Sequence, residues 1–189
     1  MLHLASQSPR RRQLLEQLGV EFVVIDVDVP EQRGTNESPN DYVSRVAREK
    51  ALAGFHKANH PDAIVLGADT EVVLADDVFG KPRDAVDAVA MLRRLSGRTH
   101  DVVSVVWLVS ATREQCAVCV SKVRFASLDD STIASYVATG EPFGKAGGYA
   151  IQGRGGALVE HLEGSYSGVM GLPVFETAKL LRDFAVLPG

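Results

Sequence analysis

Apolar positions along the chain form short runs that alternate with amphipathic stretches, which is the pattern of strands and helices in turn. The run at 63–68 is continuously apolar and predicts a strand buried on both faces. Residues 99–109 and 115–125 are apolar-rich stretches joined by a polar turn, and they predict a hairpin. Shorter strands are predicted at 2–5, 22–27, 71–75 and 157–162.

Capping residues mark the predicted helices. Ser8 followed by Pro9 begins a helix that runs to about residue 18 and ends at Gly19, and Ser38 with Pro39 begins another. Further helices are predicted at 85–95, capped by Asp84, and at 129–137 and 173–184. Strands and helices that alternate around a central hairpin predict an α/β fold on a mixed, twisted sheet with flanking helices. The chain has no repeat or linker, so residues 1–189 are predicted to form a single domain.

Length and charge exclude some functions. The chain has 189 residues and a net charge of −4, so it has no overall basic field that would hold a nucleic acid backbone. Its apolar runs are too short to span a bilayer. We therefore expect neither a nucleic acid nor a membrane partner, and any phosphate chemistry requires a local cluster of cations.

Two cysteines, Cys116 and Cys119, lie in the second strand of the predicted hairpin. Residues three apart on a strand face opposite sides, and no second Cys/His pair with ligand spacing follows. We interpret both as core residues rather than as a redox pair or half of a zinc site. Two cysteines without a signal peptide predict a cytoplasmic protein.

The segment 6–12 places three consecutive arginines in the first turn of a helix. That turn carries partial positive charge and unpaired N–H groups, so arginines are unfavourable there unless an anion binds. Backbone N–H groups and guanidinium groups would then converge on one polyphosphate. From this segment alone, a solvated basic turn is an equally good interpretation.

Asp69 follows the apolar run at 63–68, which we predict to be the carboxyl end of that strand. Ligands of open α/β sheets bind outside the carboxyl ends of strands, so Asp69 is a candidate metal ligand or general base, with a turn cap as the alternative. Lys81 is held extended by Pro82 and suits a phosphate, although a surface lysine is the default. Lys50 and Glu31 are ambiguous by themselves.

A glycine-rich segment at 145–156 contains Gln152. Glycines let the backbone approach a ligand closely, and the Gln152 amide could contact the O4/N3–H edge of uracil or thymine. A flexible loop is the alternative interpretation of this segment.

Seven segments, in order along nearly the whole chain, carry a family resemblance. They read LASQSPRRRQLL at 4–15, AREKA at 47–51, LGADTEVV at 66–73, GKPRDA at 80–85, LSGRTH at 95–100, KAGGYAIQG at 145–153 and GSYSGVMGLP at 164–173. The chain thereby resembles the Maf (septum formation protein) family of nucleoside triphosphate pyrophosphatases. This resemblance implies two lobes around a cleft, as in Maf and ITPase-like folds, and also implies a homodimer and a divalent cation, Mg²⁺ or Mn²⁺.

The resemblance also implies roles for individual residues. Asp69 falls on the general base of the family. The remaining implied roles are phosphate contacts at Ser6, Arg10, Lys50 and Lys81, and metal ligands at Glu31 and Asp69.

Three further positions indicate the branch of the family. Arg10, Thr70 and Gln152 resemble the branch that acts on dTTP and UTP, whereas another branch has Trp, Gln and Glu there and prefers 7-methyl-GTP. The alternatives are a pyrophosphatase for other non-standard nucleotides, or a non-enzymatic nucleotide-sensing regulator of cell division. Glu71 departs from the aliphatic residue common in related sequences, and either alters metal binding or points to solvent.

Overall fold

A seven-stranded mixed sheet forms the centre of the computed structural model, which describes residues 1–188. Its order is β2-β1-β3-β5-β6-β7, and β4 pairs with β3. Strands β1 and β2 run parallel to β3, and the other neighbours are antiparallel. The strands are β1 (Leu2–Leu4), β2 (Phe22–Val24), β3 (Ile64–Leu74), β4 (Asp77–Phe79), β5 (Thr99–Val109), β6 (Glu114–Phe125) and β7 (Val159–Glu163).

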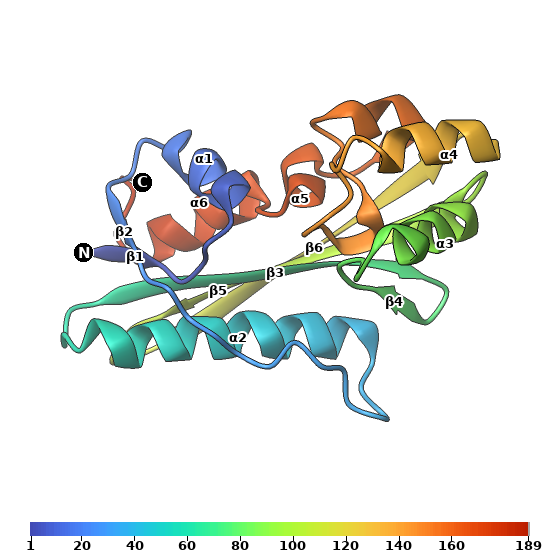
Figure 1. The fold of residues 1–189 in the computed structure, drawn as a ribbon. Helices are drawn as coiled ribbons and strands as arrows, with labels where there is room; N and C mark the ends of the chain where they lie inside the picture. Colours follow the sequence, from blue (N-terminus) through green and yellow to red (C-terminus); the bar gives the residue numbers. More distant parts are fainter. Residues whose placement is uncertain (189) are drawn as a thin grey trace.

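Helices cover the two faces of the sheet unequally. Figure 1 shows α2 along one side of the long strands, with α1, α4, α5 and α6 on the other side. The helices are α1 (Pro9–Glu16), α2 (Pro39–Ala58), α3 (Ala85–Leu95), α4 (Asp130–Val137), α5 (Tyr166–Met170) and α6 (Val174–Asp183), with 3-10 turns η1 (Ala146–Gly148) and η2 (Arg154–Leu158). The mixed α/β architecture with flanking helices confirms the predicted fold class.

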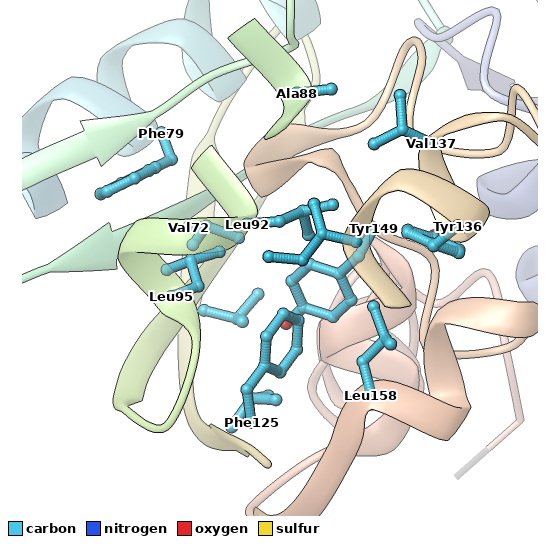
Figure 2. Packing of buried hydrophobic residues seen from close by; sticks show 13 residues of the cluster. Val72, Phe79, Ala88, Leu92, Leu95, Phe125, Tyr136, Val137, Tyr149 and Leu158 are labelled. Atoms are coloured by element: carbon cyan, nitrogen blue, oxygen red, sulfur yellow. The ribbon is translucent and has the colours of Figure 1, made fainter. Parts of the chain in front are cut away.

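Two hydrophobic clusters make the two lobes. One gathers β1, α1 and α6 around Leu4, Leu15 and Leu181. The other gathers α3, α4 and the glycine-rich segment around residues such as Leu92 and Phe125 (Figure 2). Strand β3 contributes to both clusters, and the cleft described below lies between them.

Local predictions held where short-range rules decide the structure. The side chains of Ser8, Ser38 and Asp84 accept hydrogen bonds from the backbones of the helices they cap. Strand β2 and helix α1 end earlier than predicted, and β4 and α5 were not predicted.

The prediction that Asp69 ends a strand is wrong. Strand β3 continues to Leu74, because residues 70–73 pair with β5 and residues 72–74 also pair with β4. Asp69 therefore lies in the middle of an eleven-residue strand.

The interpretation of both cysteines as core residues is correct for one of them. Cys119 is buried, whereas Cys116 is exposed. Helix α2 contacts β3 and β5 and leaves the same face of β6 open, where Val118 is 50% and Val120 46% exposed. Among residues 1–188, no helix is both long and apolar enough to cross a membrane.

Candidate active site

A gap along the edge of β3 opens the cleft. Residues 64–66 of that edge pair with β1 and residues 72–74 pair with β4, so within the described sheet residues 67–71 have no strand on that side. A cavity of about 310 Å³ lies there. All eight residues singled out from the sequence line it: Ser6, Arg10, Glu31, Lys50, Asp69, Thr70, Lys81 and Gln152.

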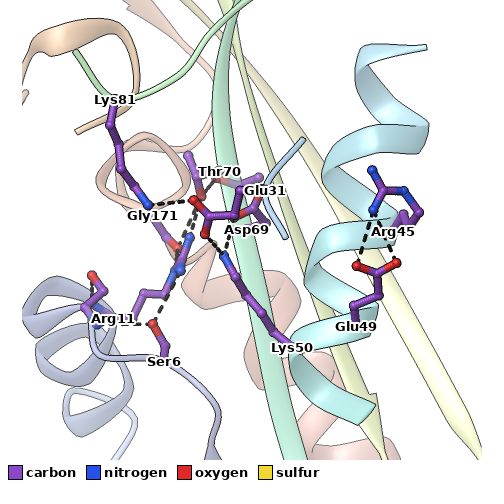
Figure 3. Close-up of polar contacts among 12 residues, drawn as sticks. Ser6, Arg11, Glu31, Arg45, Glu49, Lys50, Asp69, Thr70, Lys81 and Gly171 are labelled. Atoms are coloured by element: carbon purple, nitrogen blue, oxygen red, sulfur yellow. Dashed lines mark hydrogen bonds and ion pairs between the residues drawn. The ribbon is translucent and has the colours of Figure 1, made fainter. Parts of the chain in front are cut away.

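The geometry of Lys50 links the two predicted metal ligands. Its Nζ donates to Asp69 Oδ1 at 2.7 Å and to Glu31 Oε1 at 2.6 Å (Figure 3). Lys81 Nζ donates to the other Glu31 oxygen, also at 2.7 Å. Burial acts to raise the pKa of Glu31, but the hydrogen bonds from Lys50 and Lys81 outweigh it and lower that pKa to about 2. Glu31 is therefore a carboxylate at neutral pH and holds both lysines at the cleft.

Helix α2 places Lys50 beside Asp69 by packing closely on β3. A Cβ atom on Gly67 would lie 2.4 Å from the Ala47 carbonyl oxygen and 2.5 Å from the Ala51 amide nitrogen. Only glycine allows this approach, which brings one helical turn of α2 directly over β3. Lys50 lies on that turn, and its side chain is buried together with that of Asp69.

Glu71 shares the face of β3 on which Asp69 lies, because alternate residues of a strand point to the same side. Glu71 is buried, so the alternative that it points to solvent is wrong. Burial, followed by the charges of Asp69 and Glu31, raises the pKa of Glu71 to about 8. Asp69 Oδ2 and Glu71 Oε2 are both buried and have no hydrogen-bond partner within residues 1–188.

The free Asp69 Oδ2 fits a hard divalent cation, which prefers carboxylate ligands, whereas Glu71, with its pKa raised to about 8, is largely protonated at neutral pH. The described part of the chain contains no cluster of three or more His, Cys, Asp or Glu side chains arranged to hold a metal alone. This combination suits Mg²⁺ or Mn²⁺, since Mg²⁺ is usually bound by one or two carboxylates together with substrate phosphates.

Arg11 is a site residue that the sequence analysis did not single out. Its Nε donates to the Gly171 carbonyl oxygen at 2.8 Å, and its terminal nitrogens reach Ser6 Oγ and Thr70 Oγ1, each at 3.4 Å (Figure 3). Burial lowers the pKa of the Arg11 guanidinium. A usable clue was its position three and four residues before the buried Leu14 and Leu15, which points it inward.

The three consecutive arginines diverge in the structure. Arg10 lines the cavity, and its Nε donates to the Met170 carbonyl oxygen at 3.3 Å. Arg12 is exposed and lines a separate surface depression with Glu16. Two of the three arginines therefore serve the cleft.

The charged lining of the cavity suits a polyphosphate. Its cationic side chains are Arg10, Arg11, Lys50, Lys81 and Lys145, and its acidic side chains are Glu31, Asp69 and Glu71. The balance is positive although the whole chain is acidic, which meets the requirement for a local cationic cluster.

The other wall of the cavity is mainly apolar. Val72, Val102, Tyr149 and Val169 line it, and the exposed Gln152 lies at its margin. A site with a cationic end and an apolar end with a few polar groups is shaped for a nucleotide.

A family match and two similar relatives agree on one family. Residues 1–184 match the family described as Maf-like protein. The "dTTP/UTP pyrophosphatase" of Xanthomonas euvesicatoria pv. vesicatoria (strain 85-10) is 60% identical, over 97% of this chain and 98% of that protein. The "Nucleoside triphosphate pyrophosphatase" of Xylella fastidiosa (strain 9a5c) is 57% identical over the same shares. The solved structure of the Staphylococcus aureus Ham1 protein matches with a TM-score of 0.44 and 17% identity, over 66% of this chain and 71% of that chain.

Proposed function

The chain belongs to the Maf family, and from this premise we propose that it is a nucleoside triphosphate pyrophosphatase that hydrolyses dTTP and UTP to the monophosphate and pyrophosphate. The observation that carries the proposal is the single cavity in which Asp69 lies among five cationic side chains. Relatives up to 60% identical that bear the name dTTP/UTP pyrophosphatase support the choice of substrate.

In our proposal the triphosphate lies over the loop from Ser6 to Arg10, and the cations of the cleft offset its charge. Asp69 is the general base, and it accepts a proton from the water that attacks the α-phosphorus in line. Lys50 orients Asp69 through Oδ1, which leaves Oδ2 available to that water. Pyrophosphate leaves, and the surrounding lysines and arginines stabilise the charge that develops on it.

Glu31 and Asp69 would hold a divalent cation, Mg²⁺ or Mn²⁺, together with phosphate oxygens. Such an ion supplies charge neutralisation on the phosphates and lowers the pKa of water. Each Glu31 oxygen accepts one hydrogen bond, from Lys50 or from Lys81, and keeps a second lone pair with which it could contact the cation while Lys50 stays on Asp69.

Arg10, Thr70 and Gln152 are proposed to select the nucleobase. The Gln152 amide can both donate and accept, as the O4/N3–H edge of uracil or thymine requires. We expect the base pocket that Thr70 and Gln152 line to exclude purines by size.

Pyrophosphate release from dTTP, UTP, CTP, GTP and 7-methyl-GTP, each with Mg²⁺ and with Mn²⁺, tests the proposal. We expect dTTP and UTP to have the highest kcat/KM, and chelation of the metal to abolish turnover. Preferential turnover of 7-methyl-GTP would assign the chain to a different substrate class. Tight nucleotide binding without pyrophosphate release would instead indicate a nucleotide-sensing protein.

We further propose a cytoplasmic homodimer. Both cysteines are free, as is usual in a reducing compartment. The exposed stripe of Cys116, Val118 and Val120 on β6 is a candidate for the dimer contact. Light scattering after gel filtration should give about twice the chain mass of 20.3 kDa, and Val118→Lys should return the monomer.

A further inference from the structure

A buried serine on β5 lies under the proposed specificity residue Thr70. The register places Thr70 directly opposite Ser104, and Ser104 opposite Cys119 on β6. The two hydroxyl oxygens are 2.7 Å apart, and Ser104 is 1% exposed. Ser104 does not line the cavity itself, so any influence on the substrate passes through Thr70.

The direction of the hydrogen bond between these hydroxyls follows from their neighbours. Ser104 Oγ also lies 2.6 Å from the Gly168 carbonyl oxygen, which can only accept. A serine hydroxyl has one proton, so Ser104 donates it to Gly168 and has none for Thr70. Thr70 must therefore donate to Ser104. The other acceptor near Thr70, the Gly171 carbonyl oxygen, is farther away at 3.4 Å.

This direction fixes what Thr70 offers to the cleft. With its proton turned toward Ser104, the Thr70 oxygen presents only lone pairs on its other side. A terminal nitrogen of Arg11 already points at that oxygen from 3.4 Å. Where N3 of the nucleobase faces Thr70, uracil and thymine bring the N3–H donor that this oxygen needs, whereas N3 of cytosine is a second acceptor. The Gln152 amide then meets the neighbouring group, donating to O4 of uracil or thymine.

We propose that Ser104 is a positioning residue that fixes the Thr70 hydroxyl as an acceptor toward the cleft and thereby favours nucleobases with a ring N–H over cytosine. The inference rests on the proposed function, because it concerns the choice among pyrimidine triphosphates at the same site. It depends on two consecutive hydrogen bonds: Thr70 donates to Ser104, and Ser104 donates to the Gly168 carbonyl oxygen.

The test compares Ser104→Ala with a matched serine. Ser121 is equally buried, at 1% exposed, and its hydroxyl accepts from the Ser165 amide at 2.9 Å, so it supports the same α5 segment without contacting Thr70. Without Ser104 Oγ, the Thr70 hydroxyl is free to rotate and donate into the cleft. We expect Ser104→Ala to reduce the kcat/KM ratio of UTP over CTP about tenfold, the effect of one hydrogen bond, while Ser121→Ala stays within about twofold of wild type.

A double-mutant cycle shows whether Ser104 acts through Thr70. In a Thr70→Val background, which removes the hydroxyl, adding Ser104→Ala should change the ratio by less than about twofold. The proposal is overturned by an unchanged ratio in folded Ser104→Ala, by an equal loss in Ser121→Ala, or by additive losses in the cycle. Ser104→Cys, which is close in volume, replaces the alanine variant if that variant does not fold.

Binding measurements separate this inference from the proposed function. Calorimetry with α,β-methylene analogues of UTP and CTP gives the same selectivity ratio without turnover. A wild-type protein that prefers the UTP analogue but releases no pyrophosphate contradicts the proposed hydrolysis alone. Normal hydrolysis with a ratio unaffected by Ser104→Ala contradicts this inference alone.

Discussion

At the residue scale, Asp69 and Lys50 form a buried pair in which Asp69 Oδ2 has no hydrogen-bond partner among residues 1–188. A carboxylate held in this way is prepared for proton transfer, because its orientation is set while one oxygen stays available. A substitution of Asp69 can therefore test the role of this pair in catalysis separately from its role in folding.

Asp69→Asn keeps the shape of the side chain and an oxygen that can accept from Lys50, but it removes the base. We expect kcat for UTP to fall by about 10²–10⁴-fold, with a melting temperature close to that of wild type. Steady-state kinetics and calorimetric melting check the two parts. Turnover near the wild-type level would remove Asp69 from the mechanism.

His100 makes stability depend on pH. Its Nε2 lies 2.9 Å from Tyr149 Oη, and burial lowers the pKa of His100 to about 4. Below about pH 6.5 the His100 imidazole is protonated in the unfolded chain but stays neutral in the folded protein. The free energy of unfolding therefore falls as pH decreases from 6.5 toward 4. Between pH 7 and pH 5, wild type should lose about 2 kcal/mol more of its free energy of unfolding than His100→Gln.

Urea unfolding at the two pH values measures this difference. His161→Gln, at an exposed position on β7, is the matched control and should follow wild type. Parallel losses in wild type and His100→Gln would show that His100 is not the source of the acid sensitivity.

Some residues of the site could be predicted from the sequence and others could not. Ser8 as a cap and Lys81 before Pro82 follow from local rules, and the structure brings Lys81 to the cleft. Arg11 was missed because its partners, Ser6 and Thr70, meet only when α1 docks against β3. The direction of the hydrogen bond from Thr70 likewise depends on the register between β3 and β5, which no local sequence pattern contains.

At the scale of elements, sequence periodicity identified the long helices and strands. It failed for β4, with three residues, and α5, with five, because so few residues define no period. Periodicity also gave β3 as two pieces, 63–68 and 71–75, with Asp69 at the end of the first, whereas the structure joins them into one strand from Ile64 to Leu74.

The contact of α2 with β3 gives a prediction at this scale. Gly67→Ala would place a Cβ against the backbone of α2, so the helix must shift and move Lys50 relative to Asp69. We expect a loss of about 1–3 kcal/mol in the free energy of unfolding together with lower kcat. Gly34→Ala, where the nearest atoms are 3.6 Å away, is the control and should change neither. A stable, fully active Gly67→Ala protein would show that the contact is looser than described.

At the scale of the whole molecule, β3 joins the two lobes. Leu66 belongs to the hydrophobic cluster of one lobe and Val72 to that of the other, six residues along the same strand. Strand β5 pairs with β3 from residue 65 to residue 73 and reinforces the connection. The two walls of the cleft are therefore tied together by sheet hydrogen bonds.

This connection predicts little movement on binding. Domain closure usually uses hinges in loops or at the ends of elements. Small-angle X-ray scattering with and without an α,β-methylene UTP analogue should give radii of gyration within about 1 Å of each other. A larger contraction would show that the lobes rotate despite the shared strands.

Because β3 lies beneath the binding surface and belongs to both lobes, it also bears on how new substrate preferences arise. A different base can be accommodated by exchanging individual side chains along β3 and the glycine-rich segment. The sheet that joins the two lobes need not change. We therefore expect related chains to differ in base preference by single replacements around the cleft, while the strand that spans both lobes is kept.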